Sequence, residues 1–183
     1  PGPAGKARDP RTMIYAFHIL IGFCMVVFHT TIVPYLSLFT GCYDLLAIFV
    51  VYMGFFRSPR EAIPFVLFFG MVMDVFSGGI FGLHATAYFW LYASTLGLTL
   101  FIRKNNMLLM PAIALFGVVF ENMVMIGITA LMDTGAVIPP TAVKVVIAQA
   151  VWAFFTGPVL IVAIKFVDDR WEKFAKARET EFA

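Results

Sequence analysis

Charged residues are scarce in this chain. Asp, Glu, Lys and Arg make up 13% of its 183 residues, whereas hydrophobic residues make up 61%. Soluble domains usually carry about twice this share of charge. The composition therefore excludes an ordinary soluble domain and predicts a membrane protein. The net charge of +2 is too small, and the basic residues too scattered, for a protein that binds nucleic acid.

Cysteine and histidine are also sparse, with two and three residues. Cys24 falls within the first apolar segment and Cys42 follows the next loop, so we expect both thiols to be unpaired. His18 and His29 are separated by about 16 Å of helical rise, which is too far for one metal ion. The sequence therefore predicts no metal site and no cofactor.

Ser77, His84 and Asp74 are close in sequence, but no G-x-S-x-G motif surrounds the serine. The neighbouring glycines are typical of a turn. We therefore expect no catalytic residues and no enzyme activity.

Six apolar segments are bounded by charges, prolines and glycines, and they cover about residues 13–33, 42–56, 62–77, 84–102, 107–132 and 144–166. The second and third are shorter than the ~20 residues of an upright span. Tilt, flanking aromatic residues or burial in the bundle is expected to compensate. The predicted fold class is an all-α integral membrane protein with six transmembrane helices.

Three regions follow from these segments. Residues 1–12 form a cytoplasmic N-terminal segment that begins without Met, so we expect it either to be partly foreign to the native chain or to be a trimmed terminus. Residues 13–166 form the six-helix domain. Residues 167–183 form an amphipathic tail in which Trp171 and Phe174 stand among charges. This tail either lies along the inner membrane surface or continues the sixth helix into solvent.

Lys and Arg are almost absent from one side of this layout. With six spans, twelve of the thirteen basic residues fall on the side of the termini, and only Lys144 falls on the other. Basic residues concentrate on the cytoplasmic side of membrane proteins. Both termini are therefore predicted to be cytoplasmic.

An acid, Asp74, stands inside the third apolar segment. Gly70, Ser77 and Gly78 share its side of a helix, which would let a neighbouring backbone approach closely. Asp74 lies about 18 Å along the helix from its cytoplasmic start. A carboxylate at that depth needs a structural or functional reason.

Glu121 repeats this arrangement in the fifth segment, beside Ala114 and Gly117. Tyr88 and Tyr92 on the fourth segment are expected to donate hydroxyl hydrogen bonds to the two acids. Asn122 and Gln149 extend the predicted intramembrane polar network. Three interpretations stay open: structural hydrogen bonding, a polar cavity open to the outside, and a path for protons or ions.

The stretch around Asp74 resembles a known family. Its residues Gly70, Asp74, Ser77, Gly78 and Gly82, followed by Leu83 and Ala85, are similar to the signature G-x-x-x-D-x-x-S-G-x-x-x-G-hydrophobic-x-A of the bacterial rod shape-determining MreD family. The resemblance in layout runs from roughly Met13 to Val167. The aromatic-rich fourth segment and Thr86 depart from the family pattern.

The resemblance implies a non-enzymatic inner-membrane scaffold of the cell-elongation (rod) complex. Its expected partners are MreC, MreB and the glycosyltransferase and transpeptidase that build lateral peptidoglycan, together with membrane lipids. The family is similar in fold to the substrate-binding components of energy-coupling-factor transporters. An alternative function is therefore binding of a vitamin for such a transporter, although the first segment lacks the A-x-x-x-A face of those components.

Binding of a single-pass partner such as MreC would use small residues on a lipid-facing helix. Ala16 and Gly22 in the first segment are one candidate face. Ala153 and Gly157 in the sixth, next to Pro158, are the other.

The charge distribution predicts which loops are accessible from outside. A cysteine introduced at Gly135 should react with an impermeant reagent added to the outside of cells, whereas a cysteine at Arg103 should not. Labelling of Arg103→Cys from outside would contradict the six-span topology.

Overall fold

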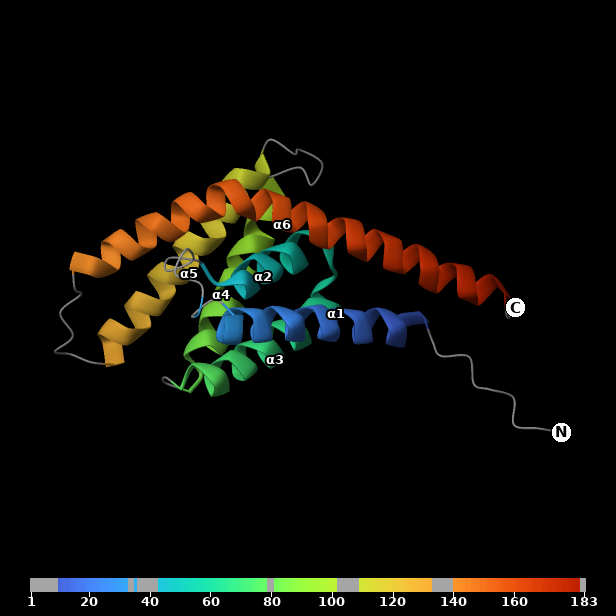
Figure 1. Cartoon of the computed structure of the whole chain (residues 1–183), viewed down its shortest axis with the longest axis horizontal. Helices are drawn as coiled ribbons and strands as arrows, with labels where there is room; N and C mark the ends of the chain where they lie inside the picture. Colours follow the sequence, from blue (N-terminus) through green and yellow to red (C-terminus); the bar gives the residue numbers. More distant parts are fainter. Residues whose placement is uncertain are drawn as a thin grey trace.

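The computed structural model describes residues 10–32, 35, 43–78, 81–101, 109–132 and 140–181. Its elements are α1 (Pro10–Val27), η1 (Phe28–Ile32), α2 (Leu45–Phe56), α3 (Pro59–Ser77), α4 (Leu83–Phe101), α5 (Met110–Met132) and α6 (Pro140–Glu181). These helices coincide closely with the six predicted apolar segments (Figure 1). Residues 1–9 of the N-terminal segment, Arg103 and Gly135 lie outside the described residues.

Three of the described helices are long and apolar enough to cross a membrane. The candidate segments, by length and composition, are Tyr15–Ile32, Met110–Met132 and Thr141–Phe174. A further apolar helix, α2, is shorter than a bilayer core requires. The chain is therefore an all-helical membrane protein over its described residues, as its composition predicts.

The short helix α2 lies at the centre of the molecule. Every residue from Leu46 to Phe55 is buried, and α2 contacts all five of the other α-helices. A helix that is hydrophobic on every face is stable only where protein or lipid surrounds it. Burial in the bundle, which was one of three expected ways to accommodate a short segment, is the one found here.

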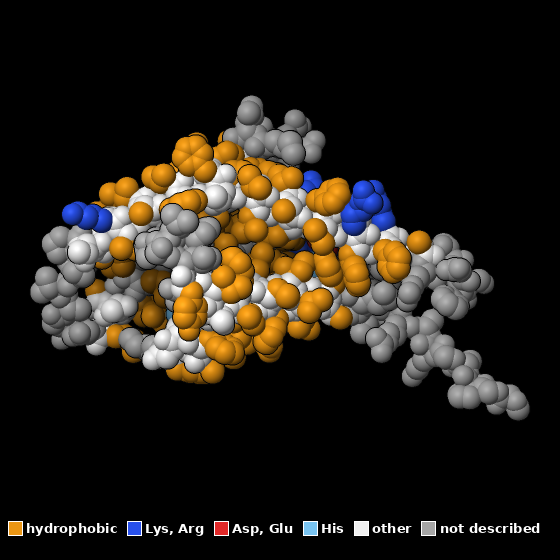
Figure 2. All heavy atoms as spheres, in the orientation of Figure 1, with side chains coloured by type: hydrophobic (Ala, Val, Ile, Leu, Met, Phe, Trp, Pro, Cys, Tyr) orange, Lys and Arg blue, Asp and Glu red, His pale blue; other side chains and the backbone are white. Residues whose placement is uncertain are grey.

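The other helices are arranged around α2. The pairs α3–α4 and α5–α6 pack along each other, and α6 arches over the bundle in Figure 1. Pro158 lies inside α6 and removes one helical hydrogen bond, which favours such a bend. Hydrophobic side chains dominate the face in Figure 2, as expected for a surface that contacts lipid tails.

The tail is a direct continuation of α6, which is one helix from Pro140 to Glu181. Its first part packs on the bundle, because the ring of Trp171 stacks on Phe17 with centroids 4.8 Å apart. Phe174, one turn further on, is about half exposed at 52%. The predicted domain boundary at residue 167 therefore does not coincide with a break in the helix.

Three of the four residues predicted to face a partner are buried instead. A Cβ atom on Gly22 would lie 2.2 Å from Cζ of Phe69, and one on Gly157 would lie 2.4 Å from Cβ of Ala114. Ala153 is also fully buried. The prediction that these three residues face a partner is wrong. Their small side chains instead allow helices of this chain to pack closely against each other. Ala16 alone of the four is exposed.

The close α5–α6 contact predicts contrasting effects of two identical substitutions. Gly157→Ala should lower the free energy of unfolding by roughly 1–3 kcal/mol, because its methyl group would overlap Ala114. Gly127→Ala should be neutral or stabilising, since nothing lies within 4 Å of its Cβ position. Unfolding in mixed detergent micelles measures both, and similar stabilities of the two variants would contradict this packing.

Candidate functional site

The carboxylate of Asp74 binds the start of the following helix. Its Oδ1 accepts hydrogen bonds from the backbone N–H of His84 at 2.7 Å, and Oδ2 accepts from those of Gly82 at 2.9 Å and Ala85 at 3.3 Å. The Nδ1 atom of the His84 ring lies 3.0 Å from Oδ1. Asp74 is only 3% exposed. Both carboxylate oxygens are therefore used as acceptors.

These contacts make Asp74 a cap for α4 supplied by α3. The first N–H groups of a helix have no partner within the helix. In a membrane protein an unsatisfied backbone group costs several kcal/mol, because lipid tails offer no acceptor. A negative charge at this end also interacts favourably with the helix dipole. Asp74 of α3 thus accepts the hydrogen bonds of the first backbone N–H groups of α4.

The glycines of the signature allow this approach. A Cβ atom on Gly70 would lie 2.5 Å from Cα of Ala85, so α3 and α4 are in backbone contact there. Gly78 and Gly82 have φ values of 64° and 92°, which favour glycine. Ser77 donates a hydrogen bond to the backbone carbonyl of Asp74 at 3.3 Å. The signature residues consequently build one joint, which we call the α3–α4 joint.

The prediction that Tyr88 and Tyr92 donate hydrogen bonds to Asp74 is wrong. The Tyr88 hydroxyl donates to Asp44. The Tyr92 hydroxyl is buried, and no partner for it is found among the described residues. The α3–α4 joint brings the N-terminus of α4, and not the side chains along α4, next to Asp74. The carboxylate oxygens therefore accept hydrogen bonds from backbone N–H groups.

A second polar cluster surrounds Asp44, at the N-terminus of α2. Asp44 caps this helix by accepting from the N–H of Leu46 at 2.9 Å. It also accepts a hydrogen bond from Tyr88, and the carboxyl group of Glu121, which is 5% exposed, lies beside it. Glu121 and Tyr88 therefore meet at an acid that the sequence reasoning did not consider.

Asp44 could have been found by its position. An Asp directly before an apolar helical run is a helix-start signal, and here the run begins at Leu45. Asn122 and Gln149 form a separate contact, in which Nδ2 of Asn122 donates to Oε1 of Gln149 at 2.8 Å and joins α5 to α6. The predicted network is thus divided into the α3–α4 joint, the Asp44 cluster and this amide pair.

A third cluster, the Asp168 cluster, holds the opposite end of α2. Arg57 follows α2 and contacts Asp168 of α6 through Nη2 at 2.6 Å and Nε at 3.2 Å. The hydroxyl of Tyr52 donates to the same carboxylate, and Nε2 of His18 lies 3.4 Å from it. Arg57 also pairs with Glu172 at 2.7 Å. Helices α1, α2 and α6 are therefore joined at one carboxylate.

Burial lowers the pKa of Arg57, but the hydrogen bond and charge of Asp168, together with the charge of Glu172, outweigh it and raise the pKa above its ordinary value. The guanidinium thus stays charged, and the buried carboxylate has a permanent partner. Asp168 was missed in the sequence, where it stands in a run of charges that is typical of a solvated tail.

Within the described part of the chain, no group of three or more His, Cys, Asp or Glu residues is placed to hold a metal ion. Comparisons of the chain with protein-family models, curated proteins and solved structures found no match. The functional argument therefore depends on the geometry of these clusters and on the resemblance of residues 70–85.

Because both Asp74 oxygens are acceptors, we expect replacement of the acid by its amide to cost more stability at Asp74 than at Glu121. Asp74→Asn should lower the free energy of unfolding by roughly 1–3 kcal/mol, because its NH2 group would face a backbone N–H. Glu121→Gln should cost less, because its amide N–H can donate to the neighbouring carboxylate of Asp44. Unfolding in mixed micelles measures both variants, and equal losses of stability would argue against the cap. Asp74→Leu, which removes both acceptor oxygens, is the reference for complete loss of the cap.

The Asp168 cluster predicts different effects for two neighbouring acids. Asp168→Asn should destabilise the protein by about 3–5 kcal/mol, because it leaves the Arg57 charge buried without its main partner. Asp169→Asn is the matched control, since Asp169 is exposed and its loss should leave the unfolding midpoint near that of the wild type. An unchanged midpoint for Asp168→Asn would show that the pair contributes nothing.

Proposed function

We propose that this chain is a non-enzymatic scaffold of the bacterial inner membrane that holds MreC in the cell-elongation complex. The observation that carries the proposal is the α3–α4 joint. The residues that resemble the MreD signature are used for architecture: Gly70 for helix contact, Asp74 for capping, and Gly78 and Gly82 for the turn. The polar groups of this signature already have hydrogen-bond partners within the chain. The signature therefore stabilises a rigid fold, which suits a protein that acts by binding other proteins.

The same geometry weighs against the two chemical interpretations of the buried acids. A carboxylate that lines a ligand cavity, or that passes protons along a path, needs an oxygen free for the ligand or the next donor. Both oxygens of Asp74 accept backbone hydrogen bonds, and Glu121 is buried beside Asp44. Structural hydrogen bonding is therefore the interpretation that these contacts favour.

The proposal includes six spans with both termini in the cytoplasm. The start of α1 and the end of α6 lie on the same side of the molecule in Figure 1, which supports this topology. MreC would then bind through its own membrane helix, because packing between apolar helices is the interaction available within the bilayer. MreB and the enzymes of lateral wall synthesis would join as members of the same complex.

Co-purification with MreC from the same genome tests the proposal. We expect tagged protein to retain MreC through extraction in mild detergent, and to lose an MreC variant whose membrane helix is replaced by that of an unrelated single-pass protein. Depletion of the chain should also round rod-shaped cells. Failure of both retention and depletion would overturn the scaffold, whereas a vitamin bound to the purified protein would favour the transporter alternative.

A further inference from the structure

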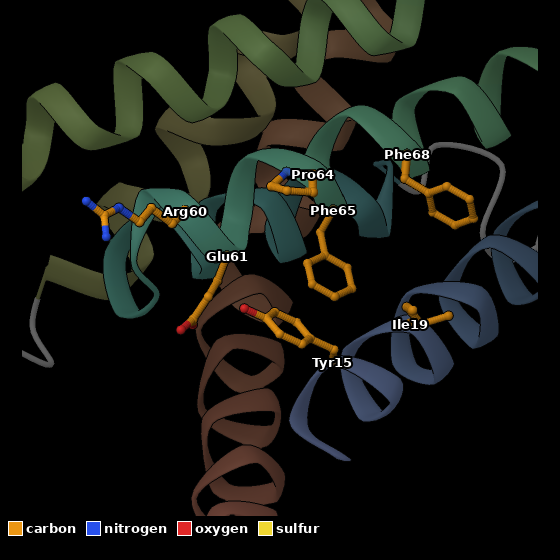
Figure 3. Close-up of a pocket in the computed structure, with 7 residues that line it drawn as sticks. All are labelled: Tyr15, Ile19, Arg60, Glu61, Pro64, Phe65 and Phe68. Atoms are coloured by element: carbon orange, nitrogen blue, oxygen red, sulfur yellow. The ribbon is translucent and has the colours of Figure 1, made fainter. Parts of the chain in front are cut away.

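An apolar groove lies between α1 and α3, near the start of both helices. It encloses about 440 Å³, and its walls include Tyr15, Ile19, Phe65 and Phe68. Figure 3 shows these side chains between the two helices, with the rings of Tyr15 and Phe65 stacked at 5.9 Å. The volume is within the range of small-molecule sites. The groove is thus large enough for a flexible hydrocarbon chain.

The mouth of the groove lies at the start of α3. Arg60 and Glu61 are in the first turn of this helix, and Tyr15 of α1 lines the groove together with them. Tyrosine and charged residues at a helix end are typical of the boundary between headgroups and acyl chains. An occupant of this groove would therefore have its apolar part between the helices and its polar part at this boundary.

Two opposite charges stand at this end of the groove without partners in the described structure. Neither Arg60 nor Glu61 forms an ion pair with another described residue, whereas nearby Arg57 is held by Asp168 and Glu172. Pro64 has no N–H and cannot donate to the carbonyl of Arg60, which adds an acceptor at the same place. The start of α3 therefore supplies one guanidinium, one carboxylate and one carbonyl beside the groove. In Figure 3 the Glu61 side chain points toward Tyr15, whereas the Arg60 side chain extends away from α1.

We propose that this groove binds an aminophospholipid, with one acyl chain between α1 and α3. The guanidinium of Arg60 would bind the phosphate, for which its paired N–H groups are suited. The carboxylate of Glu61 would accept hydrogen bonds from the primary ammonium, which has three donors. An anionic lipid would leave Glu61 without a cation, and a choline headgroup has no N–H to donate.

The walls favour a lipid over a partner helix. Close packing of membrane helices depends on Gly, Ala and Ser, which allow backbones to approach. None of these residues is among the described residues that line the groove, whose walls are aromatic side chains, an isoleucine and a proline. An acyl chain adapts to such walls, whereas a second helix would be held away from them. The lipid assignment is independent of whether the chain binds MreC.

Native mass spectrometry of the delipidated full chain tests this site. The probe is an equimolar mixture of phosphatidylethanolamine, phosphatidylcholine and phosphatidylglycerol with identical acyl chains. We expect the wild type to bind phosphatidylethanolamine about tenfold better than phosphatidylcholine, the difference that a charged hydrogen bond supplies. Glu61→Gln should abolish this preference, Arg60→Gln should weaken binding of all three lipids, and Ile19→Trp should fill the groove and remove the bound lipid.

Lys173→Gln and Asp169→Asn are the matched controls, because both remove an exposed charge from α6 outside the groove. They should bind lipid as the wild type does. Equal binding of the ethanolamine and choline lipids to the wild type would overturn the proposal. So would equal loss in the controls, or a membrane helix of a partner cross-linked into the groove in place of lipid. Thermal unfolding of each variant shows that it is folded.

Discussion

The helix α2 has twelve residues with apolar side chains on every face, and it can persist only where protein or lipid surrounds it. It is shorter than the hydrocarbon core of a bilayer, so the backbone groups at its ends need partners from the protein. Each end is held by a carboxylate. Asp44 caps the N-terminus and binds Tyr88 of α4. At the C-terminus, Arg57 and Tyr52 both bind Asp168 of α6, and His18 of α1 contacts the same carboxylate. The positions of α1, α4 and α6 are thus coupled to that of α2.

The α3–α4 joint applies the same physical solution to another helix end. The N–H groups at the start of α4 have no acceptor within the helix, and a carboxylate serves them better than a neutral group. Asp74 meets this need from α3 because Gly70 lets the two backbones touch at Ala85. An intramembrane acid is commonly taken as a sign of transport or catalysis. Here the full use of its oxygens favours an architectural role, which is what a scaffold requires.

Small residues show how one sequence pattern can serve two purposes. Glycine and alanine on an apolar helix permit close packing against any neighbour, whether within the chain or in a partner. Gly22 packs against Phe69, and Gly157 packs against Ala114, so both serve the chain itself. The surface left for other molecules is instead built of large apolar side chains, with two charges beside the α1–α3 groove that form no ion pair with another described residue. This surface is better suited to lipid than the predicted small-residue faces.

Hydropathy alone determined the membrane class and the number and approximate bounds of the helices, because an apolar run of a given length has few stable alternatives to a buried or lipid-exposed helix. Local chemistry also predicted the turn at Gly78 and Gly82, which depends only on neighbouring residues. The tertiary structure decided the partners of each polar side chain. Tyr88 meets Asp44, which is 44 residues away, and Arg57 meets Asp168, which is 111 residues away. Such contacts depend on how each helix is rotated about its axis and shifted relative to its neighbours. The periodicity of a single sequence determines neither quantity.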